Sequence, residues 1–393
     1  MRILFNIIFS AILAIGLVGF WALFLNLWKP KKKWPAWVGY IIIIGAWFAA
    51  IRYYILNQVD LYGTMYYPLM NMFRTESYGF LFGVFLAIPV FIILSLLYWT
   101  INKIWSKTPE ENRTGRRAFF RTAATIVPLA TIGGSSYAAF AGQQELVVTH
   151  ESFGYTNLPP GLKNYKIVQL SDIHIGPSID LDDFDEILKL ALLQKPNRVV
   201  ITGDLIDKLA WLPQVCERLT TFAKQIPDGV DFILGNHEYH HDVNKVLDAL
   251  KRNTPMNILV NSNIQIMGGK QPVYIAGVAY DNDRKKDNRE AMINKALSGI
   301  PDYAFVILLA HHPEFFEESI ERKIPLTLSG HTHGGQIVFM GMPLVPTGTP
   351  YTKGRYVEEQ SVCYVNNGTG HWFPIRINCP REITVITFFD GVA

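Results

Sequence analysis

Cysteine and charge are both scarce in this chain of 393 residues. It has three cysteines, and charged residues make up 18% of the sequence. Cys216, Cys363 and Cys379 do not form the Cys-x-x-Cys spacing of a thiolate metal site or a dithiol redox motif. We expect three buried free thiols, with a Cys363–Cys379 bridge as the alternative if the protein is exported. The net charge of +3 is too small to indicate a nucleic-acid partner.

Apolar residues make up 49% of the chain, and the excess lies in its first third. Three stretches there carry no charge and are long enough to cross a bilayer: residues 3–28, 34–51 and 77–101. A fourth, 122–142, is weaker because it is rich in alanine, glycine, serine and threonine. A cleaved signal peptide would explain only the first stretch. The sequence therefore predicts a transmembrane region over residues 1–143, a lipid bilayer as its partner, and a separate domain over 145–393.

The charges of the loops between these stretches predict the orientation. Four lysines follow the first stretch, the charges after the second cancel, and the loop after the third is basic. Basic loops stay in the cytoplasm, so we expect a multi-pass protein of the cell membrane with residues 145–393 outside the cytoplasm. Arg116 and Arg117 precede the fourth stretch and resemble a twin-arginine export signal, which would deliver the domain to the same side. If 122–142 does not cross, the domain stays in the cytoplasm.

Side chains that bind metals follow five short apolar runs that are typical of buried strands. They are Asp172 with His174, Asp204, Asn236 with His237 and Glu238, His311, and His331 with His333. The carboxyl ends of strands in an α/β protein meet at one edge of the sheet, where binding sites form. Imidazole is the commonest metal ligand in proteins. Five such positions in register predict one clustered site.

The same positions form a recognisable set of motifs. The blocks are Asp172-Ile173-His174, Gly203-Asp204, Gly235-Asn236-His237-Glu238, His311 and Gly330-His331-Thr332-His333. In order and identity they resemble the calcineurin-like metallophosphoesterases, in the bacterial membrane-associated or exported branch, over roughly residues 148–390. The resemblance implies an α/β fold, a four-layer α/β/β/α sandwich of two mixed sheets. Here it is preceded by an all-α transmembrane region.

The resemblance also implies two divalent ions, Mn, Fe or Zn, because the ligands are oxygen and nitrogen only. Seven ligands exceed the four of one tetrahedral ion. Asp204 is the natural bridge because a carboxylate has two oxygens. His311 is preferred to His312 because the family places its ligand two residues before Pro313. The implied sets are Asp172, His174, Asp204 and His333 for one ion, and Asp204, Asn236, His311 and His331 for the other.

Other polar residues carry less specific predictions. By the resemblance, His237 points at the leaving-group oxygen as a general acid or transition-state donor, with a supporting hydrogen bond as the alternative. His371 and Arg376 are candidate phosphate contacts. We expect His240 and His241 to be exposed at a helix start, with substrate contact as the alternative. A substrate rim or an ordinary surface loop explains the remaining group, Tyr351, Lys353, Arg355 and Tyr356.

Hydrophobic periodicity places helices between the motif strands. The expected helices are 182–194, 211–225 and 243–251, with a short one at 290–297. Further β-rich segments lie at 145–156, 273–278, 362–365 and 383–389. Strand–helix alternation predicts an α/β layered fold, and the later strands without helices predict a second sheet.

The predicted function is a membrane-anchored phosphoesterase that uses two metals to activate water. Its phosphoester substrate is a phosphodiester or a phosphate linked to lipid or to the cell envelope. One alternative is a cytoplasmic-facing hydrolase of a nucleotide-linked lipid. Another is a non-catalytic metal-binding module of the envelope. The natural substrate, the native metals and the oligomeric state stay open.

Overall fold

The computed structural model describes residues 60–104, 110–280, 285–344, 346–372 and 375–391, with five isolated positions before residue 60. The chain forms two compact units, Met1–Gln143 and Gln144–Ala393. The first two predicted spans, 3–28 and 34–51, lie outside the described residues. Each unit is considered by itself below.

The first unit contains two long helices that run antiparallel, α3 (Tyr67–Ile104) and α4 (Glu110–Gln144). Gly79 and Gly83 of α3 face α4 at very short range. A Cβ at Gly79 would lie 2.8 Å from Cα of Ser136, and one at Gly83 would lie 2.5 Å from Cα of Ile132. Small residues at this four-residue spacing let helix backbones approach closely, as they do between membrane helices.

By length and composition, one segment among the described residues qualifies to cross a membrane: Tyr67–Ile101. It contains the predicted third span, 77–101. The predicted fourth span, 122–142, lies within α4, which does not qualify by the same measure. Its alanines, glycines, serines and threonines account for the difference. A span at 122–142 therefore remains a prediction.

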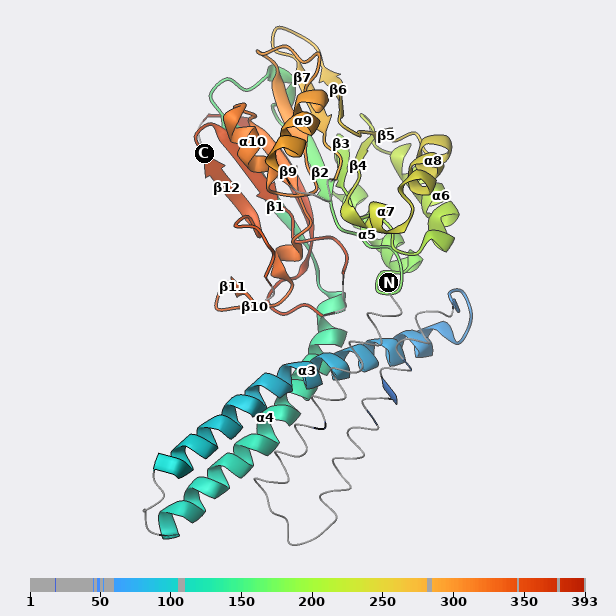
Figure 1. The fold of residues 1–393 in the computed structure, drawn as a ribbon. Coiled ribbons are helices and arrows are strands. Elements are labelled where there is room, and N and C mark those ends of the chain that lie inside the picture. Colours follow the sequence, from blue (N-terminus) through green and yellow to red (C-terminus); the bar gives the residue numbers. More distant parts are fainter. Residues whose placement is uncertain are drawn as a thin grey trace. The chain divides into compact units, whose positions relative to one another are not determined.

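Two six-stranded mixed sheets form the second unit (Figure 1). The order in the first sheet is β1 (Leu146–Tyr155), β14 (Arg381–Asp390), β2 (Lys166–Leu170), β3 (Arg198–Thr202), β4 (Val230–Ile233) and β5 (Asn257–Ile258). All neighbours in this sheet are parallel except β14 and β2.

The order in the second sheet is β12 (Gly354–Glu358), β13 (Ser361–Val365), β9 (Leu326–Ser329), β8 (Phe305–Leu309), β7 (Val273–Gly277) and β6 (Ser262–Met267). Its edge pairs, β12–β13 and β7–β6, are antiparallel and the others are parallel.

The two sheets pack face to face and helices cover their outer faces. The shared core joins Ile167 and Val200 of the first sheet to Ile307 and Leu328 of the second. A second core packs α9 (Lys286–Ala296) and α10 (Phe315–Glu321) on the outer face of the second sheet. Figure 1 shows the first sheet flanked by three more helices, α5 (Leu181–Leu193), α6 (Leu212–Ala223) and α8 (Val243–Asn253). This α/β arrangement of two mixed sheets agrees with the prediction.

Local sequence explains where these elements begin. Asp180 accepts hydrogen bonds from the backbone N–H groups of Asp182 and Asp183, which caps α5. Asp242 caps α8 in the same way through Lys245. Strand β8 is a continuous apolar run, and β3 contains the run Val199–Val200–Ile201, because these central strands are buried on both faces. The three cysteines are buried free thiols, so the Cys363–Cys379 bridge is not formed.

The remaining elements are short. They are a helix, α7 (Asn236–His241), three 3₁₀ turns, η1 (Pro160–Leu162), η2 (Leu209–Trp211) and η3 (His333–Gly335), and a hairpin of β10 (Val338–Phe339) and β11 (Met342–Pro343). The turn η3 and then the hairpin are the next elements after β9 in the chain.

Candidate metal centre

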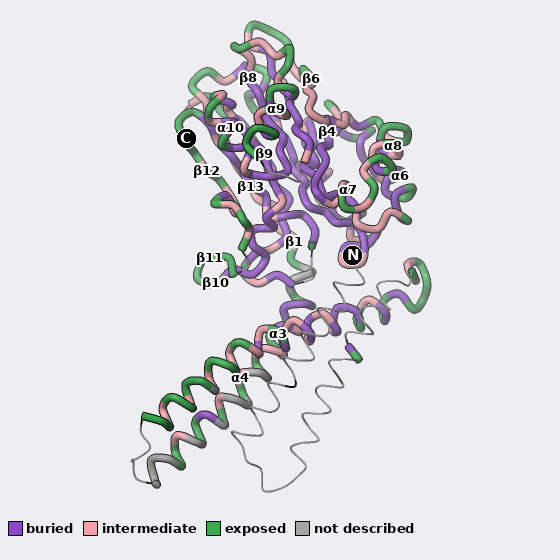
Figure 2. Tube along the Cα trace, in the orientation of Figure 1, coloured by how far each residue is buried: buried purple, intermediate pink, exposed green. Residues whose placement is uncertain are grey.

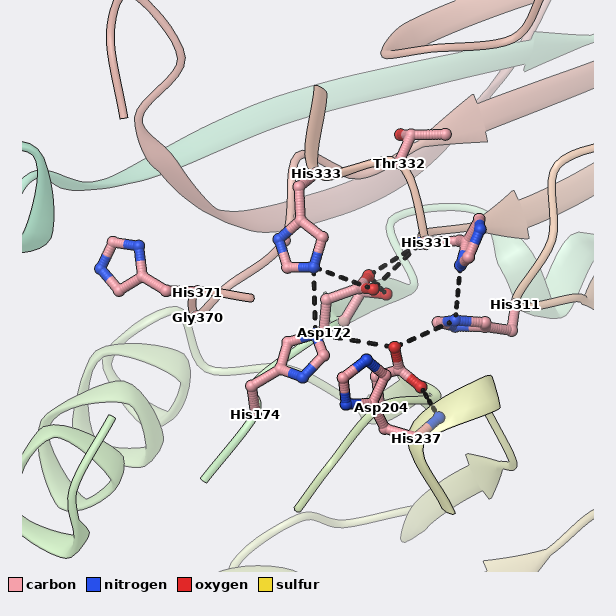
Figure 3. Close-up of polar contacts among 12 residues, drawn as sticks. Asp172, His174, Asp204, His237, His311, His331, Thr332, His333, Gly370 and His371 are labelled. Carbon is pink, nitrogen blue, oxygen red and sulfur yellow. Dashed lines mark hydrogen bonds and ion pairs between the residues drawn. The ribbon is translucent and has the colours of Figure 1, made fainter. Parts of the chain in front are cut away.

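The motif residues meet at the carboxyl ends of five strands from both sheets. Three of these strands, β2, β3 and β4, are neighbours in the first sheet, and the other two, β8 and β9, are neighbours in the second. The sequence predicted a shared edge; the structure forms it from two facing sheets. Figure 3 shows the carboxylates of Asp172 and Asp204 surrounded by the imidazole rings of His174, His311 and His333.

Most of these side chains leave their strands through an uncommon backbone conformation. Five candidate ligands have φ between 51° and 69°, a left-handed region that residues other than glycine rarely adopt: Asp172, His174, Asp204, His331 and His333. Strained backbone of this kind persists where the surrounding structure fixes it, and it collects at functional sites. Two glycines permit the close packing of the loops. A Cβ at Gly235 would collide with the Asp204 carboxylate, and one at Gly330 with that of Asp172.

One half of the centre joins two aspartates and two histidines. Nε2 of His174 lies 3.0 Å from Nε2 of His333. The same His333 atom lies 3.5 Å from Oδ1 of Asp172, and Nε2 of His174 lies 3.6 Å from Oδ2 of Asp204. Asp172 and His174 are at most 1% exposed.

The other half joins Asp204 to an amide and two more histidines. Nε2 of His311 lies 3.3 Å from Oδ2 of Asp204 and 3.0 Å from Oδ1 of Asn236. Nδ1 of His331 lies 2.9 Å from the same Asn236 oxygen and 3.3 Å from Nε2 of His311. The seven predicted ligands therefore form two adjoining groups.

The spacing within both groups fits metal coordination. Nitrogen and oxygen ligands lie about 2.0–2.2 Å from a transition-metal ion, so neighbouring ligand atoms at right or tetrahedral angles lie roughly 2.8–3.6 Å apart. The observed separations run from 2.9 Å to 3.6 Å. The donors are imidazole, carboxylate and amide oxygen, which suit Mn, Fe or Zn.

Asp204 links the two groups through one oxygen. Its Oδ2 atom is the one that faces both His174 and His311. Its Oδ1 atom accepts a hydrogen bond of 2.8 Å from the backbone N–H of His237. One carboxylate oxygen therefore lies between the two groups, while the other holds the backbone at the start of α7; that Asp204 bridges two ions stays a prediction.

The pKa values of Asp204 and His311 show that a positive charge on His311 occupies the place that a bound cation would take. Burial works against ionisation of Asp204, but His311 opposes it and holds the pKa of Asp204 well below its usual range. Burial likewise disfavours a charged His311, but Asp204 raises the pKa of His311 to about 10. The proton on His311 supplies the positive charge that the buried carboxylate needs, and metal binding releases such protons.

Two supporting residues hold the loops in place. The carboxylate of Glu238 accepts hydrogen bonds from the backbone N–H groups of Asp204, Leu205 and Gly235, at 3.0, 2.8 and 2.7 Å. Nδ1 of His311 lies 2.8 Å from the carbonyl oxygen of Thr202. That contact assigns the N–H to Nδ1 and leaves Nε2 as the ligand atom.

Asp207 lies in the centre and was not among the residues predicted from the sequence. Its Oδ1 lies 2.6 Å from Nδ1 of His237 and 3.3 Å from Nε2 of His241, and its Oδ2 lies 3.3 Å from Nδ1 of His174. Burial opposes its ionisation, but His174 and the other imidazoles keep the pKa of Asp207 well below its usual range. The sequence feature that could have indicated Asp207 is its position three residues after Asp204, in the same loop.

His237 is placed to exchange protons at the edge of the centre. Burial lowers the pKa of His237, but the hydrogen bond to Asp207 and the charge of Asp204 outweigh it and raise that pKa to about 9. His240 is exposed, as predicted, whereas His241 is half-buried and contacts Asp207. Both residues end α7 and do not begin a helix.

His371 and Arg376 do not occupy the position predicted for phosphate contacts. Arg376 is 4% exposed and donates to the backbone carbonyls of Asn367, Gly370 and Cys379 at 2.9, 2.7 and 3.1 Å. His371 is 1% exposed, and its Nδ1 accepts a hydrogen bond of 3.3 Å from Nε of Arg376. Arg376 instead lies behind the centre, with Nη2 3.2 Å from Nδ1 of His333.

His312, the alternative to His311, lies outside both groups. Its ring stacks on that of His331, with centroids 3.7 Å apart, and on that of Tyr280 at 5.1 Å. Its Nδ1 lies 3.4 Å from the carboxylate of Glu314. The structure therefore favours His311 as the ligand and gives His312 a packing role behind His331.

Comparison with known proteins agrees with this geometry. The model of the calcineurin-like phosphoesterase family matches residues 165–335. The chain is 30% identical to an uncharacterized metallophosphoesterase of Campylobacter jejuni over 353 residues, which is 88% of this chain and 87% of the relative. It is 30% identical to the metallophosphoesterase YkuE of Bacillus subtilis over 65% of this chain and 90% of the relative. It is 28% identical to a Danio rerio protein named transmembrane protein with metallophosphoesterase domain, over 77% and 71%.

The two-sheet fold and the histidine–aspartate cluster define a metal-dependent hydrolase of phosphoester bonds. The chain belongs to the calcineurin-like phosphoesterase family. The apolar helix and the relatives named as transmembrane proteins also support association with a membrane.

Proposed function

We propose that the centre holds two divalent cations. Asp172, His174, Asp204 and His333 bind one, and Asp204, Asn236, His311 and His331 bind the other. The observation that carries the proposal is Oδ2 of Asp204, which faces His174 at 3.6 Å and His311 at 3.3 Å. A single carboxylate oxygen between two ligand groups is the arrangement expected of a bridge.

When bound, the two cations supply an activated water nucleophile and neutralise charge on the phosphoryl oxygens. The chain provides a site shaped for this. Because metal binding releases the proton of His311, an occupied centre would hold the carboxylates of Asp172 and Asp204 among neutral imidazoles. Such a centre has excess positive charge and attracts an oxyanion. Burial and the nearby His174 and Arg376 hold the pKa of His333 well below its usual range, which keeps that imidazole neutral and able to bind a metal.

His237 acts as the proton donor to the leaving-group oxygen. Asp207 accepts the hydrogen bond from Nδ1 of His237 at 2.6 Å, which fixes the ring and leaves Nε2 for proton transfer. The backbone N–H of His237 is held by Asp204. The donor is thus positioned by the bridging carboxylate itself.

Metal titration of the purified full-length protein tests this proposal. The protein is stripped with a chelator and reloaded with Mn²⁺, Fe²⁺ or Zn²⁺, and bound metal and hydrolysis of bis(p-nitrophenyl) phosphate are measured together. We expect two ions per chain and activity that returns as they bind. Activity that survives chelation, or saturation at one ion, contradicts it.

We further propose that the protein is a multi-pass membrane protein with its catalytic domain outside the cytoplasm. Support comes from the apolar segment Tyr67–Ile101 and from the alternation of basic and neutral loops. The substrate would then be a phosphoester on a lipid head group or in the cell envelope, because free nucleotides are scarce there.

The low apolarity of α4 favours a second candidate. If residues 122–142 do not cross, the domain faces the cytoplasm and a nucleotide-linked lipid becomes the better substrate class. Fusions of alkaline phosphatase and green fluorescent protein after Glu145 decide between them. An active phosphatase supports the first arrangement, and a fluorescent fusion with a silent phosphatase supports the second.

A further inference from the structure

The hairpin that follows the metal-binding loop has an unusual surface. Residues 337–346 carry no charge. Four large apolar side chains of this hairpin are 60–83% exposed: Phe339, Met340, Met342 and Leu344. Figure 2 shows β10 and β11 as an exposed projection of the domain. Single exposed apolar residues are common, but contiguous ones mark an interaction surface.

The pair of central residues in the hairpin turn, Met340 and Gly341, differs from the pairs that usually stabilise a turn of this kind. Met340 and Gly341 have φ of 50° and 82°, so both central residues are left-handed. Such two-residue turns prefer asparagine or aspartate followed by glycine. A methionine that is 83% exposed at this strained position gives the fold no packing energy. Its presence is explained if the side chain is buried against something outside the domain.

The hairpin lies close to the point where the chain enters the domain. The backbone N–H of Val338 donates to the carbonyl of Ile377 at 3.0 Å. Four residues further along, the N–H of Arg381 donates to the carbonyl of Glu145 at 3.0 Å. A four-residue segment spans at most about 14 Å. The two hydrogen-bonded backbone contacts add about 5 Å each. The base of the hairpin, at Val338, therefore lies within roughly 24 Å of Glu145, the residue that follows α4.

The end of α4 is level with the edge of the apolar segment of α3. A Cβ at Gly79 of α3 would lie 3.0 Å from Cβ of Ala139 of α4. Gly79 also approaches Cα of Ser136, and Gly83 approaches Cα of Ile132. In this antiparallel register, seven further residues of α4 after Ser136, about 10.5 Å, bring Gln143 level with Met72 of α3. The uncharged stretch of α3 begins at Ser77. If Tyr67–Ile101 spans the membrane, Glu145 emerges at the bilayer surface.

The hairpin is also continuous with the metal centre. It begins three residues after Gly335, the last residue of the η3 turn that starts at His333. Gln336 fixes this connection, because its Nε2 donates to the carbonyl of Ile375 at 2.9 Å and its side chain is buried. A surface that binds the hairpin therefore lies close to the metal ligands.

We propose that the hairpin of residues 338–344 inserts into the surface of the bilayer that anchors the chain and presents the metal centre to phosphoesters carried by lipids. The occupant of the apolar surface is the phospholipid bilayer. Phe339, Met340, Met342 and Leu344 enter the boundary between head groups and acyl chains, as apolar faces of interfacial segments do. The lipid-borne substrate rests on the proposed function, whereas the insertion does not.

Depth measurement in a membrane tests the insertion. The three native thiols are buried, so a cysteine introduced as Met340→Cys in the full-length protein can be labelled selectively with an environment-sensitive fluorophore. Tyr303→Cys is the matched control, because Tyr303 is 64% exposed and precedes β8, at the end away from the centre. In phosphatidylglycerol–phosphatidylethanolamine nanodiscs, we expect the probe at 340 to be blue-shifted and quenched about twofold by brominated acyl chains. Equal emission and no quenching at both positions overturns the insertion.

Activity on two kinds of ester tests the presentation of substrate. The double variant Met340→Asp, Met342→Asp should lose roughly tenfold in turnover of a fluorescent phospholipid diester in vesicles, and keep its turnover of water-soluble bis(p-nitrophenyl) phosphate. Tyr303→Asp should change neither. Equal loss on both esters, or a wild-type protein active on the soluble ester and inert on the lipid, overturns lipid presentation. A wild-type protein inert on both esters with metals bound contradicts the proposed function, and the depth measurement still decides the insertion.

Discussion

Two neighbouring segments after β9 reverse the usual distribution of polar and apolar residues. Residues 330–336 are polar and mostly buried, with His333 and Gln336 at most 5% exposed. Residues 338–344 include four large apolar side chains that are exposed. In a soluble protein each would be unfavourable, because buried polar groups need partners and exposed apolar surface favours association. From this comparison we infer that both segments are completed from outside the chain, one by cations and the other by a membrane.

The largest effect is expected at the bridge. Asp204→Asn removes the charge that both ligand groups share, so we expect loss of both ions and a fall in turnover of roughly 1000-fold or more. Metal content by elemental analysis and steady-state hydrolysis measure it. Asp185→Asn is the control, since Asp185 is an exposed partner of Arg218. A variant of Asp204 that keeps both ions would show that the buried polar segment has another purpose.

Removing the proposed proton donor should separate chemistry from metal binding. His237→Ala should keep both ions and lose about 100- to 10,000-fold in kcat, because general acid catalysis contributes that much. An ester with a good leaving group, which needs no protonation, should be hydrolysed with a smaller loss. Depletion of metal in this variant would instead make His237 part of the metal site.

A smaller loss is expected at the residue that positions the donor. Asp207→Asn should lower kcat about 10- to 100-fold with little change in metal content, since supporting partners of ligands have effects of that size. The contact of Asp207 with His174 at 3.3 Å makes a modest fall in metal affinity part of the same expectation. Full activity in Asp207→Asn would mean that neither His237 nor His174 depends on it for orientation.

Stability measurements compare buried and exposed apolar residues directly. Leu328→Ala in the fully buried β9 should cost about 2–5 kcal/mol of unfolding free energy. Met340→Ser in the exposed turn should change it by no more than about 0.5 kcal/mol in detergent solution. Chemical unfolding followed by circular dichroism measures both. A Met340→Ser variant as unstable as Leu328→Ala would show that the hairpin packs within the protein.

The core of the fold could be predicted because its signals are local. Apolar runs such as Val199–Val200–Ile201, followed by glycine and a metal-binding side chain, mark central parallel strands, and the structure forms them. Capping aspartates such as Asp180 and Asp242 lie at predicted helix starts. Pairings between distant segments could not be predicted, because register depends on tertiary packing. The parallel pairing of β1 with β14, more than 230 residues away, is an example.

The site shows the same division. The predicted ligands meet because each follows a strand, and strand ends are readable in the sequence. The hydrogen bond that Oδ1 of Asp204 accepts could not be predicted from the sequence, because it depends on where the fold places the backbone N–H of His237. Arg376 was misjudged because a cation in a loop suggests phosphate, whereas the fold surrounds its guanidinium with carbonyl oxygens. Asp207 was missed because its partners come together only in three dimensions.

The most direct test of the account is the electron paramagnetic resonance spectrum of the full-length protein reconstituted with Mn²⁺. If Oδ2 of Asp204 bridges two ions, the loaded wild-type protein should show the spectrum of a spin-coupled pair, and Asp204→Asn should not. The hyperfine pattern of isolated Mn²⁺ in the fully loaded wild-type protein would contradict the central claim of a bridged pair.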